Sequence, residues 1–190
     1  MNSIPQFLQK MELDESQIPP VEDWNPDYCG EMDLIIKANG DWLHQGAVIK
    51  RDSMRRLFST IVIREDDDYF LITPVEKVAI QVEWQPFVII RYEILVSQLK
   101  GEQNNQPTYV FYDNCGNQVA LRQPQQLIFS SYQGQDLPCI NIRRNLYAAF
   151  SRSCYYELIE QAEIIEKDQQ LIPTIYSAGQ AFQLGQVKLD

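Results

Sequence analysis

The stretch from Gly40 to Phe87 constrains the fold more than any other part of this chain. It holds the only histidine, two of the three tryptophans and the densest basic cluster. At its start, Asn39-Gly40 predicts a tight turn, because both residues tolerate a positive φ. Residues 60–64 and 69–73 are rich in the β-branched and aromatic residues that favour strands. They flank an acidic turn, which predicts a hairpin. Residues 52–59 carry apolar side chains at helical spacing and predict a helix, capped by Asp52 or Ser53.

The remaining sequence extends this pattern of short strands. A near-continuous apolar run over 87–97 predicts a central strand. Turn residues separate further strand candidates at 33–38, 41–44, 47–49, 78–82, 109–113, 118–121, 126–131 and 138–143. Apolar spacing predicts a helix from Asn145 through Phe150 and a second from Cys154 to about Lys167. A short helix is predicted at 3–11, an irregular lead-in at 14–31, a polar loop at 100–108 and an extended tail from Ile172.

The two halves share an order of elements. Ile49-Lys50-Arg51 precedes one predicted helix, and Ile142-Arg143-Arg144 precedes another. This predicts an α+β fold in which two similar small units, each an antiparallel sheet plus a helix, pack together. The expected divisions are a lead-in over 1–30, a first unit over 31–84 and a second over 85–190.

Charge and composition limit the function. The net charge of −10 disfavours binding to a nucleic acid polymer, because phosphate backbones repel an acidic protein. No apolar run reaches the roughly 18 residues of a membrane span, and the N-terminus does not resemble a secretory signal. We therefore expect no membrane span and a cytoplasmic location.

The sequence contains neither a metal-binding cysteine pattern nor a known catalytic motif. Cys29, Cys115, Cys139 and Cys154 lack zinc-ligand spacing, so no metal site and reduced thiols are expected. The alternative is a redox role for Cys154 at a helix start. No GxSxG, HExxH, Walker or GxGxxG motif occurs, so the sequence predicts no catalytic residues, no enzyme and no named cofactor. His44 is either a ligand-binding or acid–base group, or a structural histidine bonded to the backbone.

Basic residues supply the best physical reason to expect an anionic ligand. Arg51, Arg143 and Arg144 all fall at predicted strand-to-helix junctions, where free amides and guanidinium groups together suit phosphate or carboxylate. The alternative is pairing with the chain's many carboxylates, or a solvated helix face for residues 50–56. Tyr155 and Tyr156 either stack on a base or fill an interface.

Three interpretations remain for Glu76 and Lys77, which follow Thr73 and Pro74 at a strand boundary. They line a cleft between the units, lie exposed in a turn, or Glu76 pairs with Arg51 to hold the helix on the sheet. The sequence by itself leaves these alternatives open.

A set of residues spread over the chain resembles a known family pattern. Its members are Trp42-Leu43-His44, Gly46, Ile49, Arg51, Leu57-Phe58, Tyr69, Leu71, Thr73–Lys77 and Pro86-Phe87, followed by Arg143-Arg144 and Tyr155–Leu158. Over about residues 30–182 the chain resembles the bacterial family called domain of unknown function 1285. It departs from the pattern at Ala47 and Ser153, where members often carry proline. The resemblance implies a duplicated α+β core with a second domain like a pleckstrin-homology barrel, no assigned enzymatic activity, a nucleotide-like ligand between the domains and a role in signalling.

Residues and resemblance together predict a non-enzymatic ligand-binding protein in bacterial signal transduction. Its pocket for a nucleotide-like or other anionic small molecule is expected between the two units, near Trp42, His44, Arg51, Thr73, Glu76, Lys77, Arg143, Arg144 and Tyr155. The alternatives are a protein-interaction module that binds a protein partner through the pleckstrin-like half and the acidic N-terminal segment, and an enzyme that uses His44 and Glu76.

Overall fold

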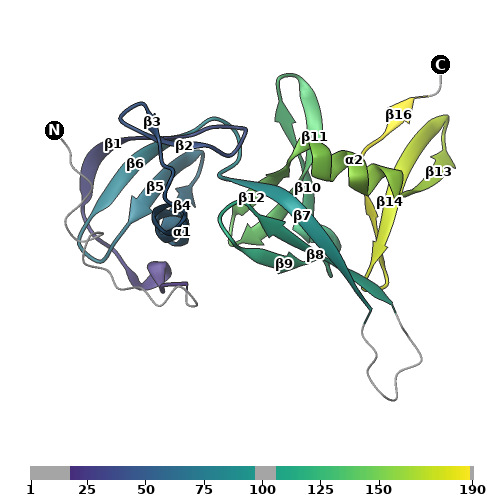
Figure 1. The fold of residues 1–190 in the computed structure, drawn as a ribbon, viewed down its shortest axis with the longest axis horizontal. Coiled ribbons are helices and arrows are strands. Elements are labelled where there is room, and N and C mark those ends of the chain that lie inside the picture. Colours follow the sequence, from purple (N-terminus) through teal and green to yellow (C-terminus); the bar gives the residue numbers. More distant parts are fainter. Residues whose placement is uncertain (1–17, 97–105, 189–190) are drawn as a thin grey trace, which may run out of the picture. The chain divides into compact units, whose positions relative to one another are not determined.

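A computed structural model describes residues 18–96 and 106–188 (Figure 1). The chain divides into two compact units, Met1–Pro86 and Phe87–Asp190. The predicted helix at 3–11 and most of the predicted loop at 100–108 lie outside the described residues. Within the described residues, no helix has the length and apolar composition needed to cross a membrane.

The described residues of unit 1 form a six-stranded sheet and one α-helix. The sheet order is β3-β2-β1-β6-β5-β4, and every neighbouring pair is antiparallel except β1–β6, which is parallel. Phe58 of the helix is fully buried, as are Leu34, Ile36 and Trp42 of the sheet. The elements are the 3-10 helix η1 Val21–Asp23, β1 Tyr28–Ile36, β2 Trp42–His44, β3 Ala47–Val48, α1 Asp52–Thr60, β4 Val62–Glu65, β5 Asp68–Ile72 and β6 Lys77–Val82.

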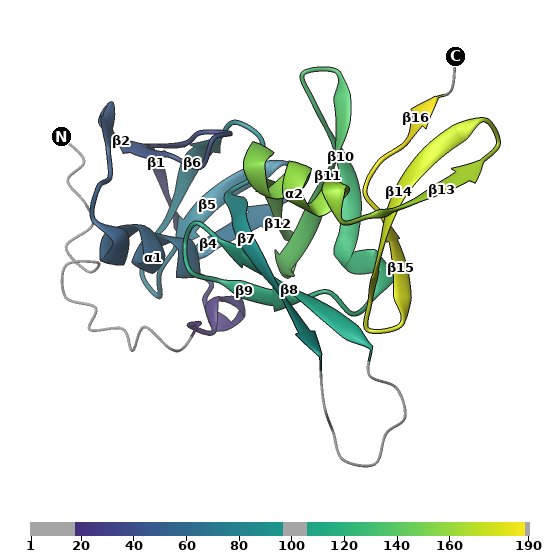
Figure 2. The same cartoon turned by 45° about the vertical axis from the view of Figure 1, so that its right-hand side comes forward.

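Unit 2 contains a second six-stranded sheet, one α-helix and a smaller sheet (Figure 2). The large sheet has the order β10-β11-β12-β7-β8-β9, with β12–β7 as its parallel pair. Ser177 links the smaller sheet to β8, since its Oγ accepts from the Tyr109 amide at 2.9 Å. The elements are β7 Phe87–Val96, β8 Pro107–Asp113, β9 Gln118–Ala120, η2 Pro124–Gln126, β10 Leu127–Tyr132, β11 Gln135–Arg143, β12 Leu146–Phe150, α2 Arg152–Glu160, β13 Glu163–Lys167, β14 Gln170–Ser177, β15 Gln180–Gln183 and β16 Val187–Lys188.

The two large sheets have the same topology. When the strands of each unit are numbered along the chain, both sheets read 3-2-1-6-5-4, and strands 1 and 6 form the parallel pair. The helices break this correspondence. In unit 1, α1 connects the third and fourth strands, whereas in unit 2 the short η2 occupies that connection and α2 follows the sixth strand. The predicted α+β fold of two similar sheet-plus-helix units is confirmed.

Most strand predictions agree with the structure, and β7 is central in its sheet as predicted. The helix predicted from Asn145 is wrong, because Leu146–Phe150 forms β12 between β11 and β7. The apolar spacing of Leu146, Ala149 and Phe150 fits a helix, but Ala148 is buried too, as expected for a strand covered on both faces.

The second predicted helix, from Cys154 to about Lys167, is too long. The observed helix α2 ends at Glu160, and Glu163–Lys167 forms β13, where Ile165 pairs with Ile172 of β14. The lead-in prediction is also wrong at its end, because β1 already begins at Tyr28 and pairs there with Lys77. Pairing with the neighbouring β14 decides the first boundary, and pairing with the distant β6 decides the second.

The predicted strand-to-helix junction at Arg143 and Arg144 is wrong as well. Both residues lie at the turn between β11 and β12, and Arg144 has a positive φ of 49°. The helix that follows begins at Arg152 and is capped by Ser151, whose Oγ accepts from the Cys154 amide at 3.4 Å. Only Arg51 occupies the junction that the sequence predicted.

Candidate anion-binding site

The start of α1 carries a basic segment, which we define as Lys50 to Arg56. Arg51 is the N-cap in an extended conformation, and its carbonyl accepts from the amides of Met54 and Arg55 at 3.1 and 3.2 Å. The predicted cap by Asp52 or Ser53 is wrong, since no side chain caps this helix. The Nε of Arg51 instead donates to the Ser53 Oγ at 3.0 Å, which holds the guanidinium beside the first turn. The helix start therefore retains its positive partial charge with an arginine next to it.

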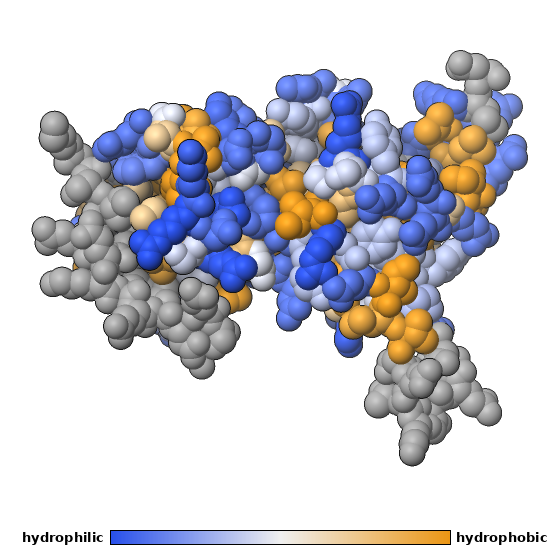
Figure 3. All heavy atoms as spheres, in the orientation of Figure 1, coloured by the Kyte–Doolittle hydropathy of each residue, from blue (hydrophilic) through white to orange (hydrophobic). Residues whose placement is uncertain are grey.

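Charge pairing distinguishes three members of this segment from the other basic residues of unit 1. The 86 residues of the unit include 16 acidic and eight basic side chains. Lys37, Arg55, Arg64 and Lys77 each pair with a carboxylate. Among the described residues of the unit, the basic side chains outside any ion pair are the exposed Lys50, Arg51 and Arg56. Figure 3 shows strongly hydrophilic side chains lying over the position of α1.

Trp42 and His44, both predicted ligand contacts, lie on β2. Trp42 is fully buried and belongs to the core, and its Nε1 finds no acceptor among the described residues. The Nδ1 of His44 lies 2.9 Å from the Asp33 carbonyl oxygen, which can only accept, so Nδ1 carries the proton. This geometry matches the structural alternative for His44.

Thr73, Glu76 and Lys77 come together in the β5–β6 turn. Buried Thr73 closes the turn, because its Oγ1 accepts from the Glu76 amide at 3.0 Å and its own amide donates to the Glu76 carbonyl at 2.8 Å. Lys77 pairs with Glu65 and lies 4.4 Å from the centre of the Phe70 ring. Glu76 forms no ion pair with Arg51, so that interpretation is wrong. Thr73 and Lys77 therefore have structural partners of their own.

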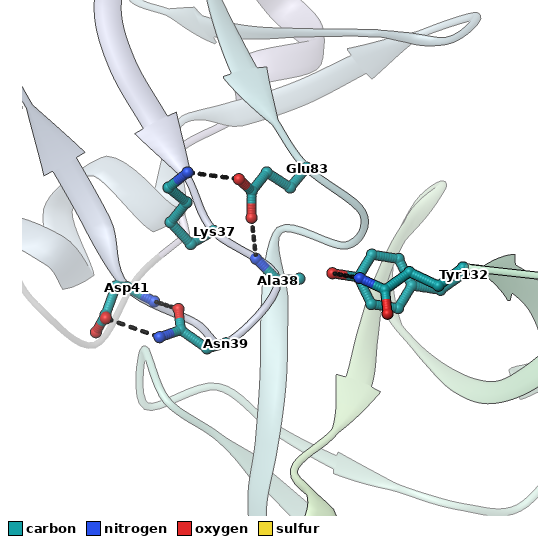
Figure 4. Close-up of polar contacts among 7 residues, drawn as sticks. Lys37, Ala38, Asn39, Asp41, Glu83 and Tyr132 are labelled. Atoms are coloured by element: carbon teal, nitrogen blue, oxygen red, sulfur yellow. Dashed lines mark hydrogen bonds and ion pairs between the residues drawn. The ribbon is translucent and has the colours of Figure 1, made fainter.

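A similar surface pair lies at the other end of β6. The carboxylate of Glu83 accepts from the Lys37 Nζ and from the Ala38 amide, the latter at 3.0 Å (Figure 4). The hydrogen bond from Lys37 is the main cause that lowers the pKa of Glu83, followed by the hydrogen bond from Ala38. Together these contacts fix the chain entering the β1–β2 turn.

Arg143 takes part in a polar cluster that the sequence did not predict. Its Nη1 donates to the Asn117 Oδ1 at 3.0 Å, and its guanidinium lies 5.2 Å from the centre of the Phe87 ring. The buried Asp113 carboxylate accepts from the amides of Cys115 and Asn117 and from the Asn117 Nδ2, at 2.8, 2.9 and 2.7 Å. We call Asp113, Asn117 and Arg143 the β8–β9 polar cluster. The available sequence signal was the turn-rich run Asp113–Asn117, which favours side-chain-to-backbone bonds.

Burial determines the protonation properties of this cluster. It raises the pKa of Asp113, while the hydrogen bonds from Asn117 and Cys115 and the charge of Arg143 act in the opposite direction. Burial lowers the pKa of Arg143 to about 10, and the charge of Asp113 opposes that shift. Arg143, itself half-buried, is therefore committed to a structural network around the buried Asp113, whereas Arg144 beside it is exposed.

Tyr155 is the last predicted contact. Its Oη donates to the Leu184 carbonyl at 3.0 Å, and its ring lies 6.2 Å from that of Phe150. Burial raises the pKa of Tyr155, as does the nearby Tyr156. These contacts favour the packing alternative, in which Tyr155 holds the C-terminal segment against α2.

Neither Cys154 nor the possible metal ligands among the described residues have the features of a functional site. Cys154 lies in the first turn of α2, but burial raises its pKa to about 11, which opposes the thiolate that a redox role needs. All four cysteines are free thiols. The described residues contain no group of three His, Cys, Asp or Glu side chains arranged to hold a metal ion.

The predicted residues thus fall into separate groups. The structure brings Thr73, Glu76 and Lys77 together in one turn, and Arg143 and Arg144 in another, while Arg51 lies at the start of α1. The pocket shared by both units stays a prediction.

The fold and these groups define a protein of two topologically equivalent, sheet-rich domains. Residues 19–85 match the family model described as the N-terminal domain of DUF1285, a domain of unknown function, and residues 86–184 match the C-terminal domain of the same family. The chain belongs to this family, as the sequence resemblance predicted. A comparison with curated proteins gives no match.

Two solved structures of family members are similar to this chain. A DUF1285 family protein from Silicibacter pomeroyi DSS-3 is 30% identical, with a TM-score of 0.77, and the match covers 95% of this chain and 93% of the other. A DUF1285 family protein from Shewanella baltica OS155 is 27% identical, with a TM-score of 0.54, and the match covers 70% of this chain and 94% of the other. Both carry the family's name and no stated activity.

Proposed function

We propose that this protein binds a small anionic molecule without transforming it, and that the basic segment at α1 supplies the cationic contacts. The observation that supports this is the exposed set Lys50, Arg51 and Arg56, which forms no ion pair with the described residues of a unit that has twice as many acidic as basic residues. In such an acidic unit, a solvated helix face would be expected to attract carboxylate partners.

The chemistry of the segment selects the class of ligand. An open helix start favours anions through its free amides, and Arg51 adds a planar donor that matches phosphate or carboxylate oxygens. A nucleotide or another phosphorylated metabolite fits this description, and ligands of that kind suit the role in signal transduction that the family resemblance implies. A thermal-shift screen identifies which of these molecules binds.

The test is a thermal-shift screen of nucleotides, phosphorylated metabolites and inorganic phosphate. A ligand at a hundred times its Kd adds about 2.7 kcal/mol to the free energy of unfolding. For a chain of this length each kcal/mol raises Tm by roughly 2–4 °C, so a true ligand gives a shift of several degrees.

Matched variants locate the site. In the double variant Arg51→Gln/Arg56→Gln the ligand-induced shift should disappear, while the Tm without ligand changes little because both side chains are exposed. The control Arg122→Gln/Arg152→Gln removes the same charge from exposed arginines of unit 2 and should keep the shift. Equal loss in both variants would show nonspecific attraction, and no shift with any compound would contradict the proposal.

A further inference from the structure

Sheet edges expose unpaired backbone groups, and proteins usually protect them with short strands, charged residues or proline. Most of the sheet edges in the described residues follow this rule. β3 has two residues and β9 has three. β4 carries Arg64 and Glu65, and β13 carries Glu163, Glu166 and Lys167. These edges are poor templates for pairing with another chain.

The edge strand β10 lacks every one of these protections. Its six residues, Leu127–Tyr132, include no charge, no proline and no glycine. The uncharged run extends from Gln123 through Gln135, between Arg122 and Asp136. All six residues pair with β11 in one register without a bulge, so the strand is regular to its end. Figures 1 and 2 show the β10–β11 hairpin as a projecting ribbon of unit 2.

The turn of this hairpin determines which backbone groups face outward. Tyr132 and Gln135 flank the two-residue turn Gln133-Gly134, in which both residues have a positive φ. In such a hairpin the flanking pair exchanges hydrogen bonds, so the amides and carbonyls of every second residue, here Phe129 and Ser131, point away from β11. These outward groups have no partner among the described residues. Both side chains are exposed, Phe129 at 45%.

We infer that β10 pairs in antiparallel fashion with β10 of a second copy of this chain. With the two-fold axis at Ser130, Phe129 of each copy lies opposite Ser131 of the other. The outward groups of these two residues then form four hydrogen bonds across the axis. This register also places Ile128 opposite Tyr132 of the second copy, so no charged side chains meet. The inference is independent of the proposed anion site.

Charge makes this edge the place on the chain where two copies meet with the least repulsion. Two copies that each carry a net charge of −10 repel each other, and the neutral run from 123 to 135 is where they meet with the fewest like charges opposed. Salt screens the remaining repulsion, so the dimer should strengthen as ionic strength rises. A single strand pair is a small contact, so the dimer should be weak and concentration-dependent.

Sedimentation velocity of the full chain over a wide concentration range, at low and high salt, tests this inference. The wild type should shift from monomer to dimer with concentration, and more so at high salt. Ser131→Pro removes one outward amide without removing a bond to β11, and should abolish the dimer. Ser131→Thr keeps the amide and should dimerise as the wild type does.

Additional outcomes keep the inference falsifiable if the proline variant fails to fold, which circular dichroism will show. Ser131→Glu keeps the amide but adds a negative charge to each copy at the axis, and should weaken the dimer. A wild type that stays monomeric under all conditions would overturn the inference. So would a folded Ser131→Pro or Ser131→Glu variant that dimerises normally, because another surface would then be responsible.

Discussion

The two units have the same strand order but use their polar residues differently. Unit 1 forms its ion pairs at the surface, as between Lys37 and Glu83, and leaves cations exposed at an uncapped helix. Unit 2 buries Asp113 beside Arg143 and caps its helix with Ser151. Unit 1 has 16 acidic and eight basic residues, whereas unit 2 has ten and eight. A shared sheet topology therefore leaves turns, helix position and charge free to differ.

The largest expected difference comes from the β8–β9 polar cluster. Asp113→Ala leaves the amides of Cys115 and Asn117 without their acceptor, and we expect a loss of about 3 kcal/mol in the free energy of unfolding. Urea denaturation measures this loss. The control Asp136→Ala removes an exposed carboxylate from the same unit and should change stability little. A loss no larger than that of the control would show that unit 2 does not depend on its buried charge.

The pH dependence of the same variant has a defined sign. Because the folded pKa of Asp113 is raised, the folded state holds this proton more tightly than the unfolded state does. Its contribution to stability is present below the ordinary aspartate pKa and is lost as pH rises through the raised pKa. The difference in the free energy of unfolding between wild type and Asp113→Ala should therefore narrow as pH rises from the ordinary aspartate pKa to the raised pKa of folded Asp113.

The helix starts give the next largest effect and compare the units directly. Ser151→Ala removes the cap of α2 and should cost about 1 kcal/mol. Arg51→Ala at the N-cap of α1 removes no bond to a free amide and should cost less. Chemical denaturation of both variants checks this order. The reverse order would mean that Arg51 has a structural role, which would weaken the proposed anion site.

Loss of the surface ion pair between Lys37 and Glu83 in unit 1 should change stability the least. Glu83 is exposed, so Glu83→Gln is expected to lower stability only slightly at neutral pH. Because its folded pKa is lowered, its contribution is present above the ordinary glutamate pKa and is lost as pH falls through the folded pKa, opposite in direction to Asp113. Tm measured from neutral to acid pH should show the wild type and Glu83→Gln converging at the acid end. Curves that stay parallel would contradict this assignment.

Local signals in the sequence predicted much of the fold. Asn39-Gly40 and the acidic run before Asp68 specify turns through their own conformational preferences; the first joins β1 to β2, and the second closes the hairpin β4–β5. The helix at Asp52–Thr60 was predicted from its apolar spacing. The basic segment was visible as a cluster because its members are adjacent in the chain. Each of these features depends on residues that are close in sequence.

The same local signals failed where the deciding partner is distant. Leu146–Phe150 has helical spacing, but pairing with β7, some sixty residues earlier, makes it a strand. That change moved Arg143 from a presumed helix start into contact with Asn117. The shared strand order of the two units was likewise hidden, because it depends on the parallel pairs β1–β6 and β7–β12.

By itself, the sequence determined the fold class, the family, the acidic charge and the basic segment, since composition, short-range patterns and spaced motifs carry these properties. Only the tertiary structure decided that Arg143 joins the buried Asp113 in one cluster, that α1 lacks a side-chain cap and that β10 is an unprotected edge. Burial, hydrogen-bond partners and edge position are properties of segments brought together from far apart in the chain, and no single segment encodes them.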